Sequence, residues 1–442
     1  MEIAALRVDL PSATGSVRRH ARTETPQHWT TAARLYGEAL ASGAIPGVAA
    51  AAPESGTATP GELRVVPIVV HDLYAQPLND LLAAAYRDLA AGEIVIVDVP
   101  GRIPNARSTG LDRDTLASAL FAAGFDCPFV AAGHQALAAE RVHKSPIDLF
   151  LTPCARGATP SHFPGLDTTL EPPPDRLIAF ARRGSLAPPR ERTLLLSVIM
   201  PVYNEHSSFC DVMERLLAKH IPGFDIEICL VESNSTDGTR EDALRYAHHP
   251  RVRLLLEDKP SGKGHAVRKG LDIATGDVVL IQDADLEYDL ADYEKLLDPI
   301  QRLEASFVLG SRHPAGEHAW QIRQFSSQRG VSEVMNLGHL FFTWFFNTMF
   351  SQRLRDPFTM FKVFRRDCIH NVRFECDRFD FDHELVGKLI RKGFSPMEIN
   401  VHYQSRSFDD GKKVAFFRDP PTWIKACLKH RFSDLYIWPA SE

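Results

Sequence analysis

The 442-residue sequence lacks several patterns that identify common protein classes. Its seven cysteines form no CxxC pair and show no zinc-ligand spacing, so neither a structural zinc site nor a disulfide framework is predicted. Such thiols are typical of a reduced, cytosolic protein. The formal net charge of −6 argues against a nucleic-acid-binding protein, because such proteins carry a basic field. We therefore expect no nucleic-acid partner.

The sequence also shows no pattern typical of a targeting segment or of a membrane-spanning segment. Residues 1–25 contain no apolar stretch after their basic residues, so we expect a flexible tail and not a secretory signal. The most apolar run, LGHLFFTWFFNTMF at residues 337–350, gives a helix of roughly 21 Å. A bilayer core is about 30 Å thick, so this run is too short to cross it. These absences predict a cytoplasmic protein.

What is present suggests two α/β units. Residues 26–155 alternate helical with strand-like patterns, which predicts a small layered α/β domain. GEIVIVDVP, followed by LDRDTLASALFAAGFD, resembles the late half of a Rossmann-type methyltransferase, but the glycine-rich nucleotide loop is missing. We therefore predict a degenerate, accessory domain that is dispensable for the chemistry of the second unit. Its predicted strands are residues 65–70, 93–99 and 148–151, and its predicted helices are residues 76–91 and 112–123.

Proline marks the boundary between the two units. Residues 156–192 are rich in proline and have little apolar periodicity, which predicts a semi-extended linker. A second α/β unit is predicted over residues 193–442.

The second unit contains the most informative segment of the chain. The apolar run at residues 278–281 ends in Gln282-Asp283-Ala284-Asp285. If the strand continues, Asp283 and Asp285 point to the same side. Two such carboxylates suit one hard divalent cation, Mg²⁺ or Mn²⁺, which often bridges protein carboxylates to substrate phosphates. An isolated DxD motif is more often a pair of solvated loop acids. The neighbouring motifs therefore decide between a metal site and a solvated loop.

Three other predicted strands also end in polar loops. The strand at 194–200 leads into PVYNE, the strand at 226–231 into ESNSTDGT, and the strand at 252–256 into KPSGKGHAVRKG. In the last loop, glycines flank Lys263, which would allow the backbone to approach a phosphate closely. Ligands of open α/β sheets bind at the carboxyl ends of strands. The four loops together predict one ligand site.

These motifs carry a family resemblance. PVYNE, STDGT, GKGHAVRKGL, QDADLEYD, LGSR, DPFTMFKVFRR, RFDFDHEL and SRSFDDGKK occur in the order seen in family 2 glycosyltransferases. Residues 194 to about 432 are most similar to the branch of dolichol-phosphate mannosyltransferase and bacterial polyprenyl-phosphate hexosyltransferases. The resemblance implies the GT-A fold, a Rossmann-like nucleotide-sugar-binding sheet, and an inverting, metal-dependent hexosyltransferase.

The resemblance also implies a donor site for a GDP- or UDP-hexose. Asp283 and Asp285 would hold Mg²⁺ or Mn²⁺ against the diphosphate, with Lys263 and Arg312 as nearby cations. The family usually has two aspartates where this chain has Glu232 and Ser233, which changes base and ribose recognition. The expected nucleoside pocket comprises Pro201, Tyr203, Glu205, Glu232 and Ser233.

The predicted acceptor is a polyprenyl phosphate bound by cations from separate loops. These cations are Arg323, Arg329, Arg406 and Lys412. A phosphate acceptor is already anionic, so catalysis would require positioning and charge neutralisation but no general base. The helix at 337–350, with six aromatic residues, is either an interfacial element and wall for a prenyl chain or a buried core helix. The first alternative predicts contact with the inner face of the cell membrane.

Two other functions stay open from the sequence. If the acceptor is a hydroxyl of a polysaccharide or small molecule, Asp382 or Glu384 would be the catalytic base. A nucleotide-sugar-binding protein without activity is the third hypothesis. Retention of the aspartate pair and of the cationic loops argues against it.

Overall fold

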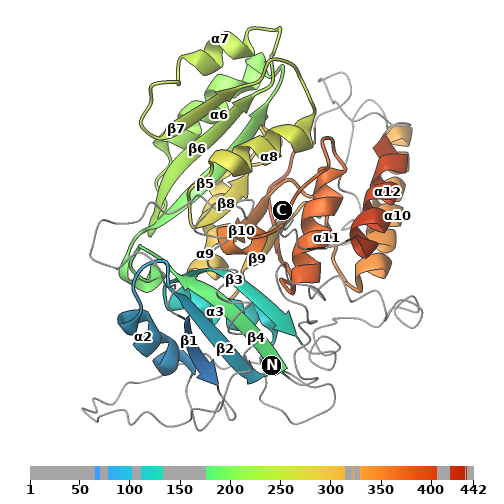
Figure 1. Cartoon of the computed structure of the whole chain (residues 1–442). Coiled ribbons are helices and arrows are strands. Elements are labelled where there is room, and N and C mark those ends of the chain that lie inside the picture. Colours follow the sequence, from blue (N-terminus) through green and yellow to red (C-terminus); the bar gives the residue numbers. More distant parts are fainter. Residues whose placement is uncertain are drawn as a thin grey trace.

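The computed structural model describes residues 65–69, 78–101, 111–132, 176–313, 322, 329–405, 419–433 and 435. Within them, two mixed β-sheets with flanking helices form a smaller N-terminal unit and a larger C-terminal unit (Figure 1). The predicted fold class, an α/β unit preceded by a smaller α/β domain, is confirmed.

The smaller unit has four described strands in the order β1-β2-β4-β3. Their bounds are β1 Val65–Val69, β2 Ile94–Pro100, β3 Phe125–Ala132 and β4 Arg176–Arg183. Two helices, α2 Leu78–Asp88 and α3 Arg113–Ala122, share a buried apolar cluster with the sheet. Both helices and the first two strands agree with the predictions to within a few residues. The strand predicted at 148–151 lies outside the described residues.

Strand β4 differs from the predicted linker. It lies inside the interval 156–192, yet it pairs antiparallel with both β2 and β3. Its run RLIAFARR is short and follows the prolines, so local composition obscures it. Pairing on both sides is a long-range property that the local pattern does not contain.

The larger sheet has seven described strands in the order β11-β9-β10-β8-β5-β6-β7. Strand β10 is antiparallel to its neighbours, and the other pairs are parallel. The strand bounds are β5 Leu194–Val202, β6 Phe224–Glu232, β7 Val252–Leu256, β8 Val278–Ile281, β9 Phe307–Ser311, β10 Lys362–Arg365 and β11 Met397–Asn400.

Strand β5 was predicted to end at residue 200, but it continues through Pro201 to Val202. Its pairing with β8 ends at Ile199, whereas its pairing with β6 extends to Val202. Pro201 therefore lies where β5 has a neighbour on one side only, and a residue without an N–H is tolerated there.

Helices cover both faces of the larger sheet. On one face, alternate residues of β5 and β6 pack against α6 and α9. On the other face, β8 and β9 pack against α8, α10 and α11. The helix bounds are α6 His206–Ala218, α7 Thr239–Leu244, α8 Lys263–Ile273, α9 Tyr293–Gln301, α10 Arg329–Phe350, α11 Phe381–Lys392 and α12 Asp419–Phe432.

The order of the strands places the ligand site. From β5 the chain adds β6 and β7 on one side and then returns to add β8 on the other side. The carboxyl ends of β5, β6 and β8 therefore meet at a switch point, where open α/β sheets bind ligands. Three of the four loops predicted to be functional follow these strands, and the fourth, after β7, also reaches the cavity through Gly262 and Lys263.

Candidate active site

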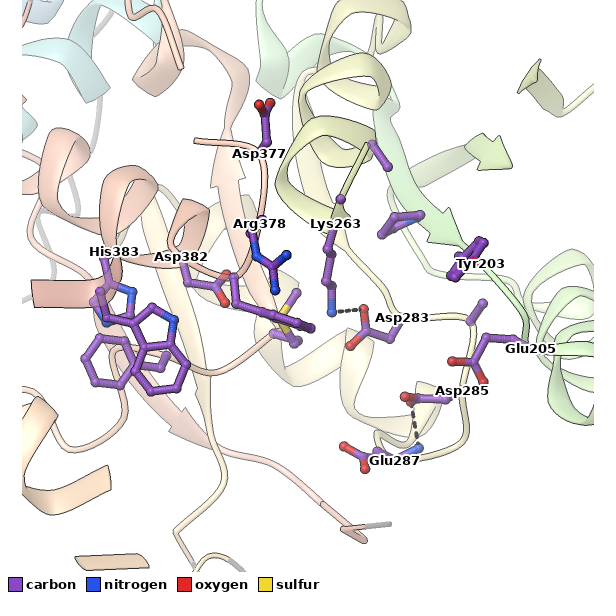
Figure 2. Close-up of a pocket in the computed structure, with 18 of the residues that line it drawn as sticks. Tyr203, Glu205, Lys263, Asp283, Asp285, Glu287, Asp377, Arg378, Asp382 and His383 are labelled. Carbon is purple, nitrogen blue, oxygen red and sulfur yellow. Dashed lines mark hydrogen bonds and ion pairs between the residues drawn. The ribbon is translucent and has the colours of Figure 1, made fainter. Parts of the chain in front are cut away.

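A cavity of about 930 Å³ lies at this switch point. Its walls come from the ends of β5, β6, β8 and β9, the start of α8, the loop before α11, and helices α10 to α12. Nine of the predicted site residues line it: Pro201, Tyr203, Glu205, Ser233, Lys263, Asp283, Asp285, Arg312 and Asp382. In Figure 2 the labelled side chains extend from His383 and Asp382, past Lys263 and Asp283, to Glu205 and Tyr203.

The two aspartates reach the cavity from a turn. Strand β8 ends at Ile281, so the strand pleat does not align them as predicted. Instead, Asp285 accepts a hydrogen bond from the backbone N–H of Glu287 at 3.1 Å. Asp283 forms an ion pair with Lys263, whose Nζ lies 2.5 Å from Asp283 Oδ1 (Figure 2).

The donor set on this wall fits a divalent metal ion. Asp283, Asp285, Glu205 and Glu287 all line the cavity and offer carboxylate oxygens. Mg²⁺ and Mn²⁺ prefer such hard oxygen donors. Asp285 is only 5% exposed, so its carboxylate is held inside the site and does not extend into solvent.

Lys263 is a cation surrounded by carboxylates. Burial acts to lower its pKa, but Asp283, Asp382 and Asp285 together outweigh burial and raise the pKa. Lys263 therefore remains a protonated ammonium group at neutral pH. A fixed positive charge at this position can face a negatively charged ligand group.

Asp382 lies between two lysines. Its Oδ1 accepts a hydrogen bond of 2.7 Å from the fully buried Lys362, which also donates to the carbonyl oxygen of Thr359. Burial lowers the pKa of Lys362, and Asp382 opposes this effect. Asp382 lines the cavity, so the structure keeps it as a candidate base for a hydroxyl acceptor.

Arg312 is held in place by a buried carboxylate. Its Nε and Nη2 donate to Asp356 at 2.8 and 2.7 Å, and its backbone N–H also donates to Asp356. Burial acts to raise the pKa of Asp356, but the guanidinium group outweighs it and holds the pKa well below its ordinary value. This bidentate pair fixes a cation on the cavity wall before any ligand arrives.

One end of the cavity includes Ser233, a residue of the predicted nucleoside pocket. Ser233 Oγ donates to Glu257 Oε2 at 2.6 Å, and Glu257 Oε1 lies 3.0 Å from His265 Nε2. Because the hydroxyl proton of Ser233 is used by Glu257, its oxygen has only acceptor capacity left for a ligand. The carboxylate of Glu257 thus lies behind Ser233 and is not itself among the residues that line the cavity.

Among the predicted site residues whose side chains the structure describes, two do not line the cavity. The fully buried Glu232 accepts hydrogen bonds from Ser235 N at 2.6 Å and from Arg240 at 2.7 Å, so it anchors the loop after β6. Glu384 is also fully buried and accepts from the backbone N–H groups of residues 375 and 376 and from Lys388. Its carboxylate is used to fix the chain before α11. The structure therefore does not support Glu384 as a base.

The glycines beside Lys263 have a packing role. A Cβ on Gly262 would lie 2.3 Å from the carbonyl oxygen of Asp377, and one on Gly264 would lie 2.6 Å from Cβ of Phe381. Gly262 also has φ of +112°, a conformation that side chains disfavour. These glycines bring α8 against residues 376–381, and the approach of their backbone to a phosphate stays a prediction.

Comparisons with known proteins identify relatives of the C-terminal unit. Residues 197–369 match the model of glycosyl transferase family 2. The chain carries a glycosyl transferase family 2 domain. It is 31% identical over 212 residues to a dolichyl-phosphate β-glucosyltransferase of Drosophila melanogaster, covering 44% of this chain and 62% of that protein. It is 31% identical over 223 residues to a dolichol-phosphate mannosyltransferase of Pyrococcus furiosus, covering 50% of this chain and 60% of that protein.

The chain thus spans less than two thirds of the length of either relative. Among solved structures, it is similar to glucosyl-3-phosphoglycerate synthase of Mycobacterium tuberculosis in complex with UDP, with a TM-score of 0.40 and 17% identity. That similarity covers 54% of this chain and 80% of the other chain.

The predicted acceptor cations of the family 2 unit stay predictions. Arg323, Arg406 and Lys412 lie outside the described residues, and Arg329 begins α10 with a side chain that is not described. On the same unit, sequence reasoning missed Glu257, Glu287, Asp356 and Lys362. The motifs QDADLEYD and DPFTMFKVFRR contain three of them, but only folding shows that Asp356 supports Arg312 and that Lys362 reaches Asp382.

Proposed function

We propose that this chain transfers a hexose from a nucleotide sugar to a polyprenyl phosphate, with inversion of configuration and with a divalent metal ion. One observation supports this function best. A single cavity joins a carboxylate-lined end at β5 and β8, a cationic middle at Lys263 and Arg312, and an aromatic wall on α10 and α12. The names of the two relatives, a glucosyltransferase and a mannosyltransferase of dolichyl phosphate, agree with the proposal.

The donor would bind at the switch point. Its nucleoside lies at the end with Tyr203 and Ser233, and its diphosphate lies near Asp283, Asp285 and Lys263. Mg²⁺ or Mn²⁺ held by Asp283 and Asp285 would neutralise charge on the diphosphate. Lys263 keeps its proton and stabilises the negative charge that grows on the leaving diphosphate.

The acceptor phosphate would react from the opposite side of the sugar. One of its oxygens attacks the anomeric carbon, the new C–O bond forms, and the bond to the diphosphate oxygen breaks. The electron pair leaves with the nucleoside diphosphate. The attacking oxygen is already anionic, so no proton needs to be removed. The fixed guanidinium of Arg312 suits the orientation of a phosphate.

The apolar wall gives a place for the prenyl chain. Met335, Gly338 and Phe342 of α10 line the cavity together with Trp423 of α12. The rings of Phe342 and Trp423 are in edge-to-face contact, with centroids 5.0 Å apart. A continuous apolar surface beside a cationic centre fits a lipid phosphate better than it fits a sugar hydroxyl.

A second candidate is transfer to a hydroxyl group, because Asp382 lines the cavity. The two functions make different demands on this residue. A hydroxyl acceptor needs a base, so Asp382→Asn would abolish transfer. A phosphate acceptor needs none, so the same variant would keep transfer with a changed acceptor requirement.

A donor screen tests the proposal. The purified protein is incubated with GDP-mannose, UDP-glucose and related nucleotide sugars, with and without polyprenyl phosphate, and the products are identified by mass spectrometry. We expect a polyprenyl-phosphate hexose to form with one donor. Glycosylation of a soluble alcohol, with no product from polyprenyl phosphate and loss of activity in Asp382→Asn, would establish the second candidate instead.

A further inference from the structure

The aromatic end of the cavity contains two polar side chains that have no hydrogen-bond partner. His383 of α11 and Trp423 of α12 both line the cavity. Neither ring nitrogen of His383, nor Nε1 of Trp423, makes a hydrogen bond of good geometry among the described residues. His383 is only 3% exposed, and burial of a polar group without a partner costs free energy. Two such groups on the wall of a cavity indicate a ligand that supplies the missing partner.

Aromatic packing holds the ring of His383 in place. The ring stacks on Phe358, with centroids 4.2 Å apart and an interplanar angle of 27°. It also stacks on Trp423, with centroids 5.7 Å apart and an angle of 18°. Stacking uses the faces of a ring, so the nitrogens at its edge keep their hydrogen-bonding capacity. The stacked rings therefore bring the polar edges of His383 and Trp423 to the same part of the wall.

His383 is a neutral imidazole. Burial lowers its pKa to about 3, and the charge of Lys362 adds to this effect, although the backbone of Phe379 opposes it. A neutral imidazole has one N–H donor and one acceptor nitrogen, and the indole of Trp423 has a donor only. The pair can therefore donate two hydrogen bonds to one ligand group that has acceptor lone pairs.

The surroundings of His383 favour an anionic group. Lys362 lowers the pKa of His383, which shows that the ring lies in a positive potential. His383 also lies in the first turn of α11, which begins at Phe381, where the helix dipole adds positive potential. The neighbouring carboxylate of Asp382 accepts a hydrogen bond from Lys362, which offsets its negative charge. An oxyanion accepts stronger hydrogen bonds at such a position than a neutral oxygen does.

We propose that His383 and Trp423 form a phosphate subsite, in which their N–H groups donate to the phosphate of the acceptor. This inference rests on the proposed function, because a polyprenyl phosphate has no other polar group to offer. His383 lies beside Asp382, on the side away from Asp283 (Figure 2). A phosphate held there would approach the sugar from the side opposite to the donor diphosphate. Trp423 also contacts Phe342, so one residue joins the phosphate subsite to the apolar wall.

Magnetic resonance of the indole N–H groups tests the subsite directly. The full chain is prepared with isotope-labelled tryptophan, which gives one resonance for each of its five tryptophans. The resonance that is missing from Trp423→Phe belongs to Trp423. We expect geranyl phosphate, a short prenyl phosphate, to shift this resonance downfield, because the N–H group gains an acceptor. Geraniol, which has a hydroxyl group in place of the phosphate, is the matched control and should not produce this shift.

Geranyl phosphate is soluble in water, so the titration needs no bilayer. No described helix is long enough and apolar enough to cross one.

The variant His383→Phe tests the second donor. It keeps an aromatic ring in the stack but removes the N–H group, so the Kd for geranyl phosphate should rise roughly tenfold or more. The Kd for the nucleotide sugar should stay the same. His383→Gln keeps an N–H donor and should recover a large part of the loss. The matched control is His370→Phe, because His370 is also 3% exposed and does not line the cavity. This control should leave both Kd values unchanged.

Three results would overturn the subsite. The first is a Trp423 resonance that does not move at saturating geranyl phosphate. The second is an equal shift with geraniol, because the bound group would then be a hydroxyl. The third is a Kd for geranyl phosphate that changes equally in His383→Phe and His370→Phe, because His383 would then act through packing alone.

Transfer assays separate failure of the subsite from failure of the proposed function. If geranyl phosphate shifts the Trp423 resonance but receives no sugar from any donor, the subsite stands and the proposed function fails. If geranyl phosphate receives sugar while the Trp423 resonance stays in place, the proposed function stands and the subsite fails.

Discussion

At the scale of single residues, the active site is a set of paired charges. Lys263 contacts Asp283, Lys362 contacts Asp382, and the guanidinium of Arg312 binds Asp356. Each cation is fixed by a carboxylate before any ligand binds, so little reorganisation is needed when the proposed diphosphate and phosphate groups bind. The cost is that several charges are buried, and loss of one partner leaves the other unpaired.

The aspartate pair gives the first prediction at this scale. Asp285→Asn should lower turnover by roughly a hundredfold or more, because a neutral amide is a poorer ligand for Mg²⁺ or Mn²⁺. The fold should persist, since an asparagine Oδ1 can still accept the hydrogen bond from Glu287 N. Initial rates and circular dichroism of the two proteins check this. Excess EDTA should stop the wild type, and addition of Mn²⁺ should restore it. A wild type at full rate in EDTA would contradict the metal role.

The positions of several site residues were predictable from the sequence alone. The sequence places Asp283, Asp285, Lys263 and Tyr203 in one site because each follows a strand-like run, and the structure brings all four to the cavity. Glu232 and Glu384 were misplaced for a physical reason. Both are carboxylates inside functional motifs, but their oxygens bind backbone N–H groups of their own loops. A motif shows which residues lie near a site and not which way each one points.

At the scale of elements, strands were easier to predict than their partners. The strands β7 and β8 were predicted with their observed bounds, because each is a short apolar run between polar loops. The antiparallel position of β10, and of β4 inside the proline-rich interval, depends on pairing between distant segments. Such pairing leaves no local signal.

Helix α10 also has a property that the sequence alone did not determine, namely which of its sides is buried. The sequence reveals one polar stripe and many aromatic residues, which left a core helix and an interfacial helix equally open. The structure shows that the polar stripe is buried and that the opposite side is exposed. Periodicity identifies the two sides of a helix, but only contacts with the rest of the fold, such as the core packing of Phe346 and Phe350, show which side faces inward.

Helix α3 gives a prediction about pH. Asp114 accepts a hydrogen bond from Ser306 of the larger unit, and burial raises its pKa from 3.8 to about 6, although Arg365 opposes the effect. Between these values the folded protein holds a proton that the unfolded chain has released. The free energy of unfolding should therefore fall as the pH rises from about 4 to 6, and this contribution should level off above that range.

The variant Asp114→Asn isolates this contribution. Asparagine keeps the shape and can still accept from Ser306, but it does not titrate. Denaturant unfolding of both proteins at pH 4.5, 5.5 and 7 should show the wild type losing stability relative to the variant as the pH rises. A difference between the two proteins that does not change with pH would show that Asp114 titrates normally.

At the scale of the whole molecule, the two units share contacts that the sequence gave no reason to expect. Arg365 of β10 is fully buried, donates to Ser118 of α3 at 2.9 Å, and lies 4.7 Å from the ring centroid of Phe121. Arg113 donates to the carbonyl oxygen of Arg391, at the end of α11, at 3.0 Å. Helix α3 thus supports both β10 and α11, which carry Lys362 and Asp382 at the active site.

These contacts change the expectation for the N-terminal unit. The sequence predicts an accessory domain that can be removed, because the glycine-rich nucleotide loop of a working enzyme is missing from it. The structure places Phe121 in the same buried cluster as Leu194 and Val308 of the larger sheet. An apolar side chain in such a cluster contributes to the stability of both units.

Removal of residues 1–189 gives the last prediction. The remaining chain should lose roughly 3–5 kcal/mol or more in free energy of unfolding, the range for deleting one buried aromatic side chain. Phe121→Ala in the full-length chain is a smaller change that keeps the N-terminal sheet. It should show a large part of the same loss in free energy of unfolding. Denaturant unfolding followed by fluorescence measures both, and donor binding reports whether the cavity survives.

A shortened chain that keeps full stability and transfers sugar would show that the N-terminal unit is a dispensable accessory domain. If the shortened chain is unstable while Phe121→Ala is not, the interface depends on Arg113 and Arg365 and not on apolar packing.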